Sequence, residues 1–221
     1  MSIFLRVVGL GFAILLAGCA ASYQSVKASY DQARPCCATL SDLKYQKLSD
    51  QGPTLVEIDE TSQVFQFDTG KSYVAAFVLP ARAAPYTLSL KSFTLGDHID
   101  SSHIFYPQVL ILDAQHQALA QHQLNGLRAT SATFFETVDA KSWGLMIKLD
   151  AAVVIDPAAA RYAVIYTTTQ LLALSSPYLT MRGAPVILFG IMTVLPMGKY
   201  QANIRHSPFG RLSLMLSELE N

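Results

Sequence analysis

The chain has 221 residues, with 16 basic and 16 acidic side chains and a formal net charge of zero. Binding to nucleic acid phosphates requires clustered Lys and Arg, and the sequence has no basic block, so we expect no nucleic acid partner. The length suits one domain with a substantial hydrophobic core.

Residues 1–18 have the pattern of a bacterial signal peptide. Arg6 precedes an apolar run over 7–16, which is too short for a membrane span of about 20 residues but is typical of a secretory signal. The run ends in LAGC (16–19), which resembles the lipobox of bacterial lipoproteins. That resemblance implies cleavage before Cys19, acylation of its thiol, and, with Ala20 following, sorting to the outer membrane. We therefore expect a lipid anchor in that membrane, facing the periplasm.

Residues 19–53 are expected to form a lipidated tether and arm, and the stretch 20–35 is polar and rich in small residues. The adjacent pair Cys36 and Cys37 leaves three arrangements open: a strained vicinal disulfide, two free thiols, or a bond to another chain. A zinc site is a poor fit, because no further cysteine or paired histidine completes a tetrahedral set. We expect no metal and no cofactor.

Residues 54–221 predict an all-β domain. Short segments with alternating or continuous apolar residues are separated by turns, and this pattern is typical of an antiparallel sandwich or barrel. One short helix is expected over 170–174, capped by Thr168 or Thr169 and stopped by Pro177. The expected strands include 63–68, 73–79, 86–91, 109–112, 143–149, 163–168 and 211–217.

The stretch 184–197, APVILFGIMTVLPM, is the most apolar part of the mature chain and carries no charge. Its β-branched residues, bounded by Pro185 and Pro196, favour a buried central strand, in which case Phe189→Asp would unfold the domain. The alternative is an extra apolar hairpin that bends at Gly190 and touches a membrane or a partner. The pattern favours the buried strand.

Several segments together resemble the maltose operon periplasmic protein family. They are KSYVAAFVLPA (71–81), YTLSLKSF (86–93), FYPQVLILDAQ (105–115), RYAVIYTTTQLLALSSPY (161–178) and GRLSLML (210–216). The same region also resembles jelly-roll sandwiches that accompany secreted peptidases and glycosidases. The resemblance implies a jelly-roll-like, galactose-binding-like fold and an exported protein linked to carbohydrate uptake, with no established enzymatic reaction. The lipobox and the Cys36-Cys37 arm depart from the family pattern.

The sequence contains no nucleophile elbow, phosphate loop or metalloprotease helix, so no catalytic residue is predicted. The densest ionisable cluster, Asp97, His98, Asp100 and His103, is read chiefly as a solvated loop and secondarily as a polar ligand site. Strand alternation makes Tyr106 the better candidate for an exposed sugar platform, whereas Trp143 fits the core, in phase with Leu145, Ile147 and Leu149.

We therefore expect a non-enzymatic accessory or binding lipoprotein related to carbohydrate uptake. Its partners would be the membrane, through the lipid, and a carbohydrate or an outer-membrane protein. The alternative is a structural or interaction lipoprotein that docks on an envelope complex. A hydrolase with an unrecognised site is the third hypothesis.

Overall fold

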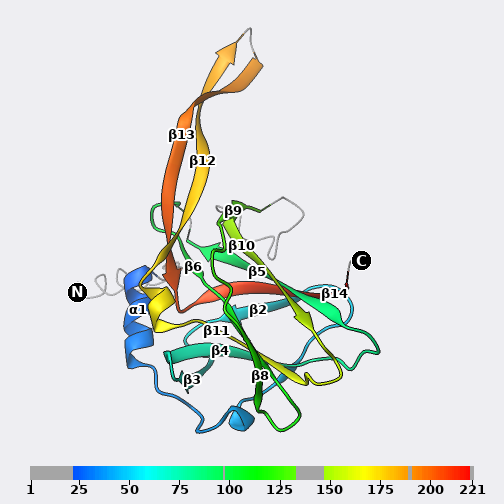
Figure 1. Cartoon of the computed structure of the whole chain (residues 1–221). Coiled ribbons are helices and arrows are strands. Elements are labelled where there is room, and N and C mark those ends of the chain that lie inside the picture. The colour runs from blue at the N-terminus through cyan, green and yellow to red at the C-terminus, as the bar shows by residue number, and fades with distance from the viewer. Residues whose placement is uncertain (1–21, 97, 133–146, 189–190, 220–221) are drawn as a thin grey trace, which may run out of the picture.

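Two β-sheets packed face to face form the body of the protein (Figure 1). The computed structural model describes residues 22–96, 98–132, 147–188 and 191–219. The structure confirms the predicted all-β sandwich. Most strand pairs are antiparallel, as expected, but β1 pairs with β4 and β6 pairs with β13 in parallel.

The first sheet has six strands within the described residues. β4 lies between β11 on one side and both β3 and β1 on the other, and β11 continues the sheet to β7 and β8. A tight turn joins β7 to β8, and in it the amide of Asp113 donates to the carbonyl of Gln117 at 3.0 Å. The strands are β1 (Gln46–Lys47), β3 (Gln63–Phe67), β4 (Gly70–Val78), β7 (Gln108–Leu112), β8 (Ala118–His122) and β11 (Tyr162–Tyr166).

The second sheet has eight strands within the described residues. β5 is central and pairs along its length with β10 and β14, while its last residues pair with β6. The strands are β2 (Thr54–Ile58), β5 (Tyr86–Leu95), β6 (His103–Phe105), β9 (Thr130–Ser131), β10 (Ile147–Ile155), β12 (Ser175–Leu188), β13 (Ile191–Ser207) and β14 (Gly210–Glu218).

The main core lies between the inner faces of the two sheets. Alternate residues of β4, β7 and β11 meet alternate residues of β2, β5, β10 and β14, as the period-two patterns predicted. Of the face predicted for 143–149, Ile147 and Leu149 are buried, while Trp143 and Leu145 lie outside the described residues. The buried residues include Tyr73, Ala75, Phe77, Tyr86, Leu88, Leu90, Val109, Ile111, Ile165, Leu212 and Leu214.

The expectation that residues 20–35 form only a polar tether is wrong for α1 (Tyr23–Gln32). The hydroxyl of Ser22 accepts from the amide of Ser25 and caps the helix. Val26 and Tyr30, four residues apart on one face, are buried in the main core, and the Tyr30 hydroxyl donates to the carbonyl of Lys71 at 2.6 Å. The helix is therefore part of the folded body.

The helix α2 (Thr169–Leu172) confirms the predicted short helix. The side chain of Thr168 accepts from the amide of Leu171, as the capping prediction required. The helix ends at the C-cap Ala173, before Pro177, which lies inside β12. Pro177 is therefore not what stops it.

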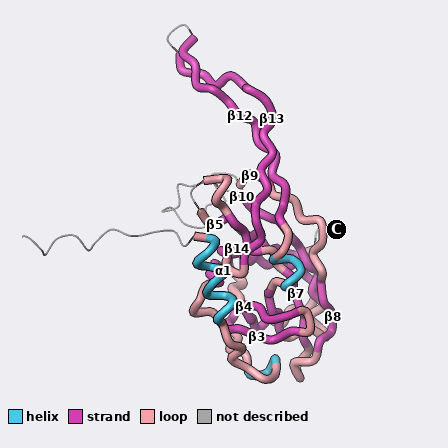
Figure 2. Tube along the Cα trace, turned by 90° about the vertical axis from the view of Figure 1, so that its left-hand side faces the viewer, coloured by secondary structure: helices cyan, strands magenta, loops and turns pink. Residues whose placement is uncertain are grey.

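The prediction of a buried central strand at 184–197 is also wrong. Residues 175–188 and 191–207 form an antiparallel hairpin whose far end projects from the body, as Figures 1 and 2 both show. Residues 191–204 of β13 pair only with β12 among the described residues, whereas residues 205–207 pair with β6. Pro185 and Pro196 lie inside the strands, where only an edge strand tolerates the missing N–H, and both strands of a two-stranded ribbon are edges. Phe189 and Gly190 lie outside the described residues.

Candidate functional site

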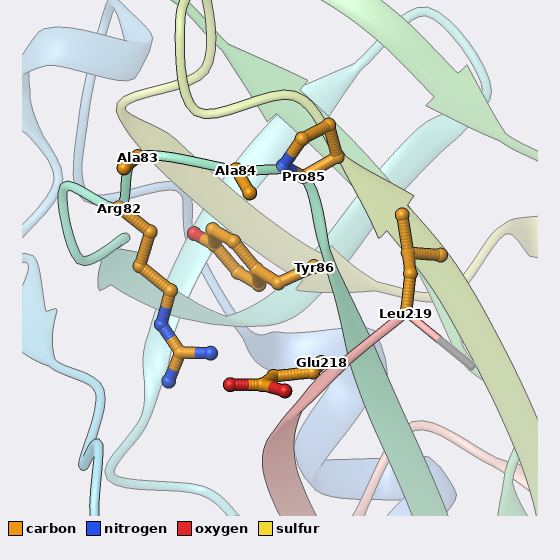
Figure 3. A pocket seen from close by; sticks show the side chains of 7 residues that line it. All are labelled: Arg82, Ala83, Ala84, Pro85, Tyr86, Glu218 and Leu219. Carbon is orange, nitrogen blue, oxygen red and sulfur yellow. The ribbon is translucent and has the colours of Figure 1, made fainter. Parts of the chain in front are cut away.

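A groove with a volume of about 670 Å³ lies where β5 begins and β14 ends. Glu218, the last residue of β14, pairs in register with Tyr86, the first residue of β5, so the two strand ends form one wall. The segment before β5 supplies the other. Figure 3 shows the side chains of Arg82 and Glu218 on the same side of the Tyr86 ring. The remaining lining residues are Ala83, Ala84, Pro85 and Leu219.

Arg82 is held in place from two directions. Its guanidinium lies 4.8 Å from the centre of the Tyr86 ring, and a terminal nitrogen lies 2.9 Å from a carboxylate oxygen of Asp50. The Tyr86 ring is only 1% exposed, and burial raises the pKa of its hydroxyl. Tyr86 is therefore a rigid support for Arg82, and Arg82 and Glu218 provide the charged groups of the groove.

The loop cluster predicted from Asp97, His98, Asp100 and His103 does not converge on one point. His98 is exposed, whereas the carboxylate of Asp100 accepts a hydrogen bond from the Tyr200 hydroxyl at 2.6 Å. His103 is buried on β6, with its ring 5.8 Å from that of Tyr23. Asp97 lies outside the described residues. The described members of the cluster therefore do not face a common ligand.

The prediction that Tyr106 is an exposed sugar platform is wrong. Tyr106 is 4% exposed, its ring lies 4.5 Å from that of His206, and its hydroxyl accepts from the amide of Leu127 at 2.9 Å. Alternation fails here because the chain leaves β6 at Phe105, so both Phe105 and Tyr106 face packed structure. Tyr106 is a structural residue.

The Sγ atoms of Cys36 and Cys37 are bonded to each other, which is the first of the three arrangements left open by the sequence. Cys36 is exposed and its amide donates to the carbonyl of Val64 at 2.8 Å, while Cys37 packs against the outer face of the six-stranded sheet. The pair therefore lies where the arm docks on the sandwich.

The arm is further held by an aromatic cluster on that outer face. The rings of His116 and Tyr162 stack with centres 4.2 Å apart, and the Tyr45 ring lies 4.6 Å from Tyr162. Burial raises the pKa of Tyr45 to about 12. His116, which lies in the turn between β7 and β8, is half-buried in this stack.

Ser176 and His206 form a hydrogen-bonded pair that sequence reasoning missed. The distance from the Ser176 Oγ to the His206 Nε2 is 2.9 Å, and the His206 Nδ1 lies 2.8 Å from the carbonyl oxygen of Leu171. A serine beside a histidine is the arrangement of a nucleophile and its base. Here the two residues are 3% and 2% exposed, so a substrate has no access to them. They join α2 to the root of the hairpin.

No sequence signal pointed to the groove. Arg82 lies in a loop between two prolines, and Glu218 lies near the end of the chain, so the two are brought together only by the pairing of β5 with β14. Within the described ranges, no group of three His, Cys, Asp or Glu side chains could hold a metal ion. Of the helices in the described part of the chain, none is long and apolar enough to cross a membrane.

The fold and the groove define a β-sandwich protein with a small, charged surface site. A family model described as maltose operon periplasmic protein precursor (MalM) matches residues 69–216. The chain therefore belongs to the MalM family, and the family name implies a periplasmic protein. The match includes Arg82 and Tyr86 and ends two residues before Glu218. Neither the comparison with curated proteins nor that with solved structures found a match.

Proposed function

We propose that this protein is a non-enzymatic, lipid-anchored accessory protein of carbohydrate uptake, held at the periplasmic face of the outer membrane, and that it binds a saccharide in the groove beside Tyr86. The family match carries the link to carbohydrate, because the family is named for the maltose operon. The LAGC motif at 16–19 supports the anchor.

The chemistry of the groove suits a saccharide. Sugar hydroxyls both donate and accept hydrogen bonds, so they accept from the guanidinium of Arg82 and donate to the carboxylate of Glu218. Pro85 and Leu219 offer apolar surface to the C–H groups of a sugar ring. A concave site with few, firmly held polar groups is typical of small-molecule binding, and Asp50 and Tyr86 hold Arg82 in this way.

A second function rests on the projecting hairpin β12–β13. A ribbon that leaves the body exposes two backbone edges, and such edges are sites at which partner strands add. This observation favours the alternative of an interaction protein that docks on an envelope complex.

Isothermal titration calorimetry of the purified protein with maltotriose tests the saccharide proposal. We expect saturable binding, which Arg82→Gln weakens about tenfold or more, because a hydrogen bond to a charged group is lost. Arg128→Gln removes an exposed arginine outside the groove and serves as the matched control.

Binding that is equal in the Arg82→Gln and Arg128→Gln proteins would show that the groove is not the site. Absence of heat with maltotriose at millimolar concentration would overturn the carbohydrate proposal and leave the interaction protein as the better hypothesis.

A further inference from the structure

The hairpin β12–β13 consists of a stem that packs on the body and a tip that does not. In the stem, Tyr178, Ala202 and Ile204 are buried against β6 and β10, while Leu179 on the opposite face is 67% exposed. The far part of the ribbon pairs only with itself in the described chain and extends away from the sandwich (Figures 1 and 2). We call residues 183–188 and 191–197 the apolar tip.

The boundary between stem and tip is marked in both the backbone and the sequence. The strand register shifts between Arg182 and Gly183, and Gly198, the partner of Arg182, has a φ of 125°. A bulge of this kind bends a ribbon and increases its twist. The last charged residues, Arg182 and Lys199, lie at the same boundary, and the apolar tip between them contains none.

The composition of the tip is unsuited to water. If one face of a ribbon is solvated, every second residue is normally polar. Thr193 is the one residue with a polar side chain in the apolar tip. An uncovered apolar surface of this kind marks a site of contact with a membrane or with another protein.

The charged residues near the apolar tip indicate what kind of surface it contacts. The hairpin from Ser175 to Ser207 contains Arg182, Lys199 and Arg205 and no acidic residue. We propose that the apolar tip enters the headgroup region of an anionic phospholipid bilayer, with Arg182 and Lys199 against the lipid phosphates. Apolar burial and attraction of basic residues to anionic lipid act together in this kind of binding.

The depth of entry is limited by the backbone. The N–H and C=O groups along the outer edges of the ribbon have no strand partner in the described chain, and unsatisfied groups in hydrocarbon cost several kcal/mol each. The tip therefore stays at the boundary between headgroups and acyl chains, about 5–10 Å deep. It does not span the bilayer.

The N-terminal end of the described body lies at the root of the hairpin, away from the tip. The Tyr23 ring lies 5.4 Å from the guanidinium carbon of Arg205, beside the root of the hairpin. The inference about the tip does not depend on acylation of the chain.

A fluorescent probe on the tip tests the inference without the lipid anchor. In full-length Cys19→Ala protein with the Cys36–Cys37 disulfide intact, Met192→Cys provides the one free thiol for labelling with nitrobenzoxadiazole. Leu179→Cys, on the exposed face of the stem, is the matched control. With vesicles of phosphatidylglycerol and phosphatidylcholine, we expect blue-shifted, brighter emission at 192 and no change at 179.

Neutralising the charges provides the second measurement. Arg182→Gln with Lys199→Gln should lower the partition of the tip probe into the anionic vesicles about 30-fold, since each basic residue near the surface contributes about fivefold. Ile187→Asp with Val194→Asp should abolish the change at 192 and leave the melting temperature unaltered, because the tip supports no part of the sandwich.

Three outcomes would overturn the inference. The probe at 192 is unchanged by anionic vesicles, or the probes at 192 and 179 respond equally, or the emission at 192 changes with protein concentration in the absence of lipid. The last result would identify a second copy of the chain as the partner of the tip. Because every variant lacks Cys19, membrane binding through the apolar tip is measured separately from membrane binding through the lipid anchor.

Discussion

The imidazole of His206 accepts or donates a hydrogen bond at 2.9 Å to the hydroxyl of Ser176 across the buried root of the hairpin. The same ring lies 4.5 Å from that of Tyr106 and contacts the carbonyl of Leu171 at the end of α2. Three segments far apart in the chain, which contain Tyr106, residues 171–176 and His206, therefore meet at one histidine. The stability of this junction depends on the charge of the ring.

We expect the protein to lose stability on acidification through His206. Burial lowers the pKa of His206 below its usual 6.5, so below that pH the unfolded chain binds more protons than the folded one. The stability contribution is complete above pH 6.5 and falls as the pH drops towards the folded pKa. His206→Gln should flatten the fall in melting temperature between pH 7 and pH 5.

The matched control for this measurement is His98→Gln, which removes an exposed histidine. It should retain the wild-type dependence of melting temperature on pH. If His98→Gln and His206→Gln flatten the curve equally, the junction at His206 is not the source of the acid sensitivity.

Val26→Asp tests whether α1 belongs to the folded domain. Val26 is 1% exposed in the main core, so an aspartate there places a charge in an apolar site and should lower the free energy of unfolding by about 3 kcal/mol or more. Ala28→Asp introduces the same side chain at an exposed position of α1 and should have a small effect. If the Val26→Asp and Ala28→Asp proteins have equal denaturation midpoints in urea, α1 is not part of the folded domain and residues 20–35 are a simple tether.

Replacing Cys36 and Cys37 by serine should cost little stability. A disulfide stabilises mainly by closing a loop in the unfolded chain, and adjacent residues close almost none. The arm keeps its other contacts with the sandwich, including the hydrogen bond from the Lys44 amide to the Gln63 side-chain oxygen at 2.7 Å. A loss of more than about 3 kcal/mol, the scale of a structural disulfide, would contradict this expectation.

Cys19→Ala should abolish lipid attachment and leave either a full-length precursor or a soluble product. The reason is chemical, because only a thiol at this position can accept the diacylglycerol in the lipobox reaction. Metabolic labelling with a fatty-acid analogue measures lipid attachment, and the wild-type chain is the positive control. Label in the Cys19→Ala protein would show that the anchor is elsewhere.

Local pattern was sufficient to predict the sandwich and its core. Leu88, Leu90, Leu212 and Leu214 alternate with small or polar residues, and a period of two is a property of each strand on its own. The cap of α2 by Thr168 was likewise readable, because an N-cap depends on neighbours within one turn.

Tertiary structure decided what depends on partners distant in the chain. The apolar residues of 184–197 have the composition of a buried strand, and only the pairing of β12 with β13, away from the body, made them a projecting ribbon. Tyr106 was buried by Leu127 and His206, neither of which its own strand pattern reveals. The groove needed β14 beside β5 to bring Glu218 to Arg82. Hydrophobic periodicity specifies which residues leave water, whereas long-range strand pairing specifies which residues they meet.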